Sequence, residues 1–160
     1  MIAGTQVAGV LQDTLDCVLS QLTPPPCVAC VVAGPPALDN CCDGSGPCSG
    51  QLTVHLNALV PVDQQLRRRS PSVTPCRPGA LGVDLRVTLA RCHPTLDDRG
   101  QAPDCADLSV AAGQVSADVA NMHRALTCCA GDVAVQSIDV TQPPQGGCIV
   151  VLGSAIVALQ

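Results

Sequence analysis

The chain of 160 residues carries a formal net charge of −5, and all eight of its basic residues are arginine. This acidic excess would repel a phosphate backbone, so the composition argues against a protein that holds nucleic acid nonspecifically. No apolar run approaches about 18 residues, and residues 1–8 lack the charged leader and apolar run of a signal peptide. We therefore expect neither a membrane span nor a secretory leader.

The core is expected to lack large rings, because the sequence contains no Phe, Tyr or Trp. Val, Leu, Ala and Cys have to fill it, and full burial of each Val or Leu contributes only about 1.5–3 kcal/mol. A chain of this length can still bury most of the surface that its unfolded form exposes. We expect one domain over residues 1–160 that folds without help from disulfides or a metal.

Two segments have apolar residues at helical spacing. In residues 4–22 the apolar positions share one face, and a run of three prolines ends the helix. In residues 108–126 the apolar stripe leaves Asp118 on a different face. Asp107 or Ser109 is expected to cap this second helix.

Five segments are predicted as strands. Residues 51–60 and 81–90 alternate between apolar and polar side chains, which is typical of a strand with one face in a core. Residues 27–33 form a short, nearly continuous apolar run that favours a buried strand, and residues 133–140 form a further strand. Residues 148–159 are apolar on both faces, which predicts a closing strand that lies centrally or is covered by a partner.

Residues 61–79 are rich in proline and charge and predict a long mobile loop. The Arg67, Arg68 and Arg69 run inside it could contact phosphate or an acidic partner, although such short runs are most often solvated. The order helix, strand, strand, strand, helix, strand, strand has connections too short for most parallel crossovers. It predicts an α+β fold with an antiparallel or mixed β-sheet and helices packed on one face.

Twelve cysteines leave three interpretations open. Because no secretory leader is visible, we expect mostly buried reduced thiols, with disulfides as the second interpretation. Cys27-x-x-Cys30 with Cys41, Cys42 and Cys48 could supply thiolates to zinc. Residues three apart on a strand point to opposite faces, so we expect no metal and no cofactor.

Cys92 and His93, close to Asp97 in the sequence, suggest a cysteine nucleophile with a base and an orienting acid. Adjacent residues at a strand end diverge, however, and no glycine-framed oxyanion site is evident. We therefore expect no catalytic residue and no enzyme. His55, on a polar strand face, and His123, on a helix flank, are interpreted as exposed side chains.

Four stretches together carry a family resemblance. They are residues 37–42 with 50–54, residues 89–98, residues 124–126 and residues 143–148. The arginine-cysteine-x-proline-x-x-aspartate-aspartate piece that starts at Arg91 and the glutamine-glycine-glycine-cysteine turn that ends at Cys148 are the most specific. In order and spacing the chain resembles the tail terminator proteins of long-tailed bacteriophages that infect actinobacteria, although relatives tend to carry a tryptophan where Leu38 stands.

The resemblance implies a structural role without catalysis. Such proteins form a ring, usually sixfold, that caps the tail tube, ends its polymerisation and presents a surface for joining the head. The implied partners are further copies of the chain in a hexameric ring, the major tail tube protein and a head-completion or stopper protein. Viral DNA would pass through the lumen without specific binding, and the acidic balance suits such a lumen. The implied location is the virion, with assembly in the host cytoplasm.

The closing strand is the candidate joint between subunits, because a sheet edge exposes unpaired backbone groups and rotational closure ends head-to-tail growth. Val151, Ala155 and Val157 are its candidate interface residues, and the three arginines of the loop are candidate contacts. Two other functions stay open. They are another neck component, such as a head-completion or stopper protein, and a small secreted cysteine-rich surface-active protein.

Overall fold

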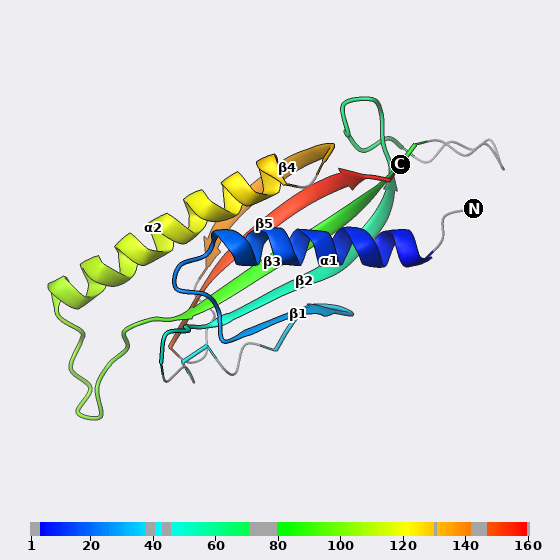
Figure 1. Ribbon diagram of the computed structural model, residues 1–160. Helices are drawn as coiled ribbons and strands as arrows, with labels where there is room; N and C mark the ends of the chain where they lie inside the picture. Colours follow the sequence, from blue (N-terminus) through cyan, green and yellow to red (C-terminus); the bar gives the residue numbers. More distant parts are fainter. Residues whose placement is uncertain are drawn as a thin grey trace.

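The computed structural model describes residues 4–37, 41–42, 46–70, 80–129, 131–141 and 147–159. The elements follow in the order α1 Gly4–Gln21, β1 Val28–Val32, β2 Gln51–Pro61, β3 Leu81–Cys92, α2 Cys105–Cys128, β4 Val133–Thr141 and β5 Cys148–Ala158. The strands form one sheet in the order β1-β2-β3-β5-β4. Both helices pack against one face of this sheet (Figure 1).

The sheet is mixed. β1 pairs in parallel with β2, whereas the β2–β3, β3–β5 and β5–β4 pairs are antiparallel. The predicted α+β fold with helices on one face is therefore confirmed, and β5 lies centrally between β3 and β4.

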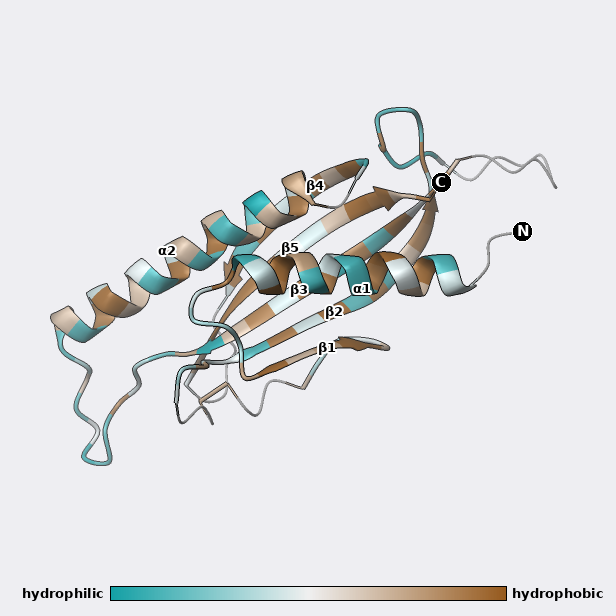
Figure 2. Ribbon diagram, viewed as in Figure 1, coloured by the Kyte–Doolittle hydropathy of each residue, from teal (hydrophilic) through white to brown (hydrophobic). Residues whose placement is uncertain are grey.

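The core lies between the sheet and the two helices. It consists of alternate strand residues and of one stripe from each helix, which are Leu11, Leu15, Val18, Leu52, Val54, Val83, Leu85, Val87, Leu89, Met122, Ala125, Leu126, Val151, Ala155 and Val157. Figure 2 shows the matching pattern, with apolar stretches along the strands and alternating apolar and polar turns on the helices. The small side chains allow close approach: a Cβ added at Gly153 would lie 2.7 Å from the Met122 sulfur.

Residues 27–33 contain a strand, as predicted, but it is not buried. β1 is an edge strand with β2 as its single neighbour, and Val28 and Val31 are 46% and 36% exposed. A continuous apolar run predicts a strand with two covered faces, and this strand shows that such a run can also mark the edge of a sheet.

The second helix begins earlier than predicted and has a different cap. Asp104 is the N-cap residue, and its carboxylate accepts a hydrogen bond of 2.8 Å from the backbone N–H of Asp107. The prediction of Asp107 or Ser109 as the cap is wrong, because both lie inside the first turns of α2. Neither α1 nor α2 is long and apolar enough to cross a membrane.

The first half of the predicted loop, residues 61–70, forms a hydrogen-bonded turn. The backbone N–H of Asp63 donates to the carbonyl of Arg67 over 3.0 Å, and the N–H of Arg69 donates to the carbonyl of Pro61 over 2.9 Å. Residues 71–79, and residues 142–146 of the predicted last turn, lie outside the described residues. The mobility expected for residues 61–79 therefore stays a prediction.

Candidate functional site

The three residues predicted as a subunit interface lie inside the chain. Val151 and Ala155 are fully buried and Val157 is 6% exposed, all in the core beneath the helices. Because β5 is central, its inner face is covered by α1 and α2 and needs no partner. We correct the assignment accordingly, since these side chains stabilise the monomer and do not present a joint.

The other face of the sheet, which the two helices do not cover, carries a row of polar side chains across neighbouring strands. His55 on β2 lies opposite Arg86 on β3, which lies opposite Ser154 on β5. His55 was predicted to be exposed, but neighbouring strands leave only 7% of it accessible. The His55 Nδ1 and Thr53 Oγ1 atoms are buried and have no hydrogen-bond partner within the described ranges. Burial, followed by the Arg86 charge, lowers the pKa of His55 below its ordinary value.

This lowered pKa predicts a loss of stability on the acid side. The unfolded chain, in which the histidine pKa is about 6.5, binds the proton more readily than the folded chain. Stability contributed by neutral His55 is therefore present above about pH 6.5 and is lost as the pH falls below it. We expect the melting temperature of the wild type to fall more steeply between about pH 7 and pH 5 than that of His55→Gln. Equal slopes for the two proteins would contradict the assignment.

All three side chains of the arginine run are exposed, and one of them pairs with a buried carboxylate. The Arg68 guanidinium forms an ion pair with Asp84, which is fully buried and also accepts a hydrogen bond of 2.6 Å from the Asn57 side chain. Arg67 and Arg69 are exposed. The Arg68 side chain stays 55% exposed but is already paired, so Arg67 and Arg69 are the two whose charges this ion pair does not engage.

The same turn is held by the Asp63 carboxylate. One of its oxygens accepts hydrogen bonds of 2.9 Å from the backbone N–H groups of Arg67 and Gln65. These bonds, the one from Arg67 foremost, lower the pKa of Asp63. The turn therefore presents its arginines from a defined backbone.

A buried ion pair fixes α2 to β3. The Arg91 guanidinium donates two hydrogen bonds, of 3.0 and 2.9 Å, to the two carboxylate oxygens of Asp118, and the side chains are 3% and 0% exposed. Arg91 also donates to the backbone carbonyls of Pro24, over 2.9 Å, and Ser49. One side chain thus joins α2, the α1–β1 connection and the start of β2. Sequence reasoning missed this pair, because both elements carry other charged residues, such as Arg86 on β3 and Arg124 on α2, and nothing in the sequence singles out Arg91 and Asp118.

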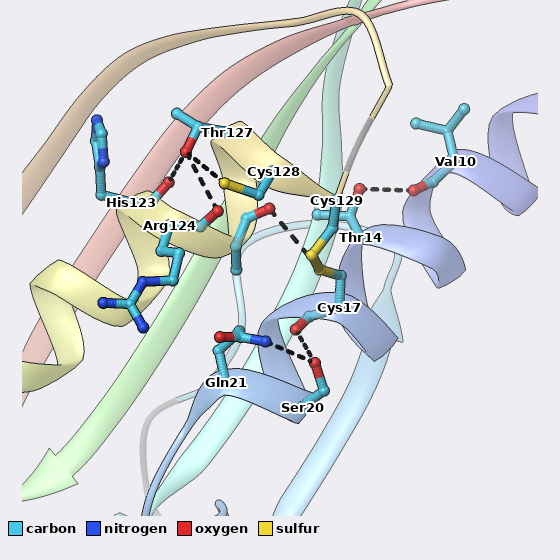
Figure 3. Close-up of a disulfide and its surroundings, with 11 residues drawn as sticks. Val10, Thr14, Cys17, Ser20, Gln21, His123, Arg124, Thr127, Cys128 and Cys129 are labelled. Atoms are coloured by element: carbon cyan, nitrogen blue, oxygen red, sulfur yellow. Dashed lines mark hydrogen bonds between the residues drawn. A yellow bond between two sulfur atoms is a disulfide. The ribbon is translucent and has the colours of Figure 1, made fainter.

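The expectation of mostly reduced thiols is contradicted. Within the described residues, which leave out Cys76, four disulfides join Cys17 with Cys129, Cys27 with Cys48, Cys41 with Cys148, and Cys42 with Cys92. Figure 3 shows the first of them, which links α1 to the end of α2. Cys30, Cys105 and Cys128 are free. The expectation failed because it rested on the assumed compartment, whereas the fold brings partners with large sequence separations together.

Three of the stretches that carry the family resemblance meet at one end of the sheet. Cys92 and Cys148 are cross-strand neighbours on β3 and β5, and the adjacent Cys41 and Cys42 bond to them. The backbone N–H of His93 donates to the carbonyl of Gly147 over 2.6 Å. Residues around positions 41, 92 and 147 therefore form one covalently closed cluster, which we call the cysteine cluster.

The disulfides rule on the two chemistries that the sequence suggested for these cysteines, a nucleophile at Cys92 and a zinc site. Cys92 is bonded to Cys42, so its sulfur is not a free nucleophile in this structure. Of the five cysteines considered for zinc, four are in disulfides and Cys30 stands alone on β1. Across the described part of the chain, no group of three or more His, Cys or acidic side chains is placed to hold a metal ion.

The disulfides also predict a rank order of stabilities. The Cys17–Cys129 bridge spans a separation of 112 residues, and the Cys27–Cys48 bridge spans 21. Loop-closure entropy grows with the logarithm of this length, so C17S/C129S is expected to lose about 1.5 kcal/mol more than C27S/C48S. Urea unfolding of the two oxidised double variants measures the difference. Equal losses, or the reverse order, would contradict the expectation.

Comparison with known proteins adds no family assignment. No protein-family model matches the chain, and no curated protein matches it. Among solved structures, one similar chain is the sheath/tube terminator of an extracellular contractile injection system, PVC, in its extended state, determined by cryo-EM. The similarity has a TM-score of 0.29 and 14% sequence identity, and it covers the whole of this chain. The present chain spans 58% of the length of that terminator.

Proposed function

We propose that this chain is a structural virion protein, a tail terminator that forms a ring at the head-proximal end of a phage tail tube. In this role it ends tube polymerisation, joins the tail to a head-completion or stopper protein and lets DNA pass. The ring is proposed to be hexameric and to assemble in the host cytoplasm. No catalytic step is proposed.

The observation that carries the proposal is the convergence of the resembling stretches. Three segments that are distant in the sequence, around Cys41, Cys92 and Cys148, are fixed to one another at one end of the sheet. A resemblance spread along a chain is stronger support when its parts form one three-dimensional unit. The net charge of −5 also supports a passage for DNA, because fixed negative charge does not retain a polyanion.

Electron microscopy of the purified protein tests this function. We expect closed rings of the protein alone, and tubes with blunt capped ends when it is mixed with its tail-tube subunit during tube assembly. Unlimited tube growth in its presence would contradict a terminator. Rings that bind a neck protein but leave tube growth unchanged would favour another neck component.

A secreted cysteine-rich surface-active protein is the second candidate, and the four disulfides favour it. Cys30, Cys105 and Cys128, the free cysteines among the described residues, weigh against it. A count of free thiols on freshly purified protein under denaturing conditions separates the two. If the protein is a secreted surface-active protein, nearly all cysteines should be paired. If it is a virion protein, at least three free thiols should be counted.

A further inference from the structure

One end of the molecule carries a projecting arm, defined here as residues 93–112. It consists of the loop after β3 and the first turns of α2, and Figure 1 shows it extending past the end of the sheet. α2 has 24 residues and is therefore about 36 Å long, but its buried residues start only at Asp118. The sequence predicted that the stripe from Leu108 onward faces the core. In the structure the beginning of that stripe is only partly covered, and Ala112 is exposed.

The arm is both apolar and acidic. Leu96, Leu108 and Val110 are 63%, 38% and 75% exposed. The charged side chains of the arm are all exposed, and they are Asp97, Asp98, Asp104, Asp107 and Arg99. Four aspartates and one arginine give the arm a net charge of −3 out of −5 for the chain. Leu108 and Val110 are two positions apart on α2 and point to opposite sides of the helix, so Val110, the most exposed of the three, is the apolar side chain that the helix leaves open to a partner.

The opposite end carries complementary features. Residues 61–70 contain three arginines and Asp63, a net charge of +2, and Arg67 and Arg69 are exposed. Beside this turn lies a groove of about 430 Å³, whose apolar walls are Leu66, Leu81, Val133 and Leu159. Asp132 also lines the groove, and the Asp63 carboxylate is already held by its own turn.

The two ends are separated by the whole of β3. This strand begins at Leu81 beside the groove and ends at Cys92, where the arm starts. Its 12 residues span roughly 40 Å, so the arm of one chain does not reach the groove of the same chain. Two complementary surfaces at opposite ends of one molecule are the arrangement that generates head-to-tail assembly, and such a contact ends growth only when it closes into a ring.

We infer that the arm of one copy docks into the groove beside Arg67 and Arg69 of the next copy. Val110 enters the groove, and the arm aspartates face the two arginines. A second copy is the occupant because both halves of the contact lie on this chain. The inference rests on the proposed ring and names its joint, which is distinct from the closing strand suggested by the sequence.

Two interface variants test the joint. Val110→Asp disables the arm and R67D/R69D disables the turn, and all three side chains are exposed, so the fold should persist by circular dichroism. We expect each variant alone to be monomeric by native mass spectrometry. Mixed one to one, they should form a dimer and nothing larger, because the first keeps an intact groove and the second an intact arm.

Val140→Asp and Arg124→Asp serve as matched controls, because both side chains are exposed outside the arm and the groove, on β4 and in the last turns of α2. Each should form rings like the wild type, with or without tail-tube subunits. If both interface variants still form rings like those of the wild type, the joint is wrong but the proposed ring is not. The same holds if rings are lost in Val140→Asp alone. Ring formation on mixing would also overturn the joint. A wild type that stays monomeric and caps no tubes would overturn the proposed function together with this joint.

Discussion

Replacing Val151 by aspartate is expected to unfold the isolated chain, with a loss of at least about 5 kcal/mol of stability. Val151 is fully buried in the core between the sheet and the helices. The substitution removes the burial of an apolar side chain and places a carboxylate where no partner is provided. Loss of the cooperative thermal transition in circular dichroism measures this effect.

The register of the sheet supplies a close control. Val140 on β4 is paired with Val151 on β5, yet it is 48% exposed. Val140→Asp should change the free energy of unfolding by no more than about 0.5 kcal/mol. A Val151→Asp protein that stays folded but no longer assembles would return this position to the subunit interface.

Much of the fold could be predicted because the periodicity of side chains depends on local geometry. The alternation in β3 requires one face in the core, and Val83, Leu85 and Val87 are fully buried as that pattern predicts. The helical stripe of residues 4–22 is confirmed in the same way, with Leu15 and Val18 buried. Both predictions need only neighbouring residues, so no knowledge of distant contacts was required.

The positions that could not be predicted depend on distant contacts. Asp118 is off the apolar stripe of its helix, which ordinarily means solvent, but Arg91 meets it from a strand. Cysteine connectivity likewise does not follow from spacing, and Cys41 pairs with Cys148 at a separation of 107 residues.

The arm shows a third limit of sequence reasoning. The spacing of Leu108 and its successors predicts a helix correctly, but the pattern does not say where the sheet beneath that helix ends. Leu108, on that stripe, is 38% exposed, and Figure 1 shows that α2 begins beyond the ends of the strands. A segment with core-like periodicity and no core beneath it is therefore visible only in the structure.

The Arg91–Asp118 pair carries the second large prediction because neither charge has access to water. Two charge-assisted hydrogen bonds offset the cost of burying both groups, and Gln114 adds a bond of 3.2 Å to one Asp118 oxygen. Removing a single partner leaves the other charge buried and uncompensated, which is far more costly than removing both. The pair also ties α2, whose first turns belong to the arm, to β3.

Arg91→Met is expected to lower the free energy of unfolding by about 3–5 kcal/mol, as measured by urea denaturation. The double variant R91M/D118L should recover part of this loss, because it removes both buried charges. Recovery should stay incomplete, since the carbonyls of Pro24 and Ser49 still lose their donor. Arg124→Met, at an exposed arginine on α2, is the control and should be nearly neutral. A loss below about 1 kcal/mol for Arg91→Met would show that the buried pair does not fix α2 to the sheet.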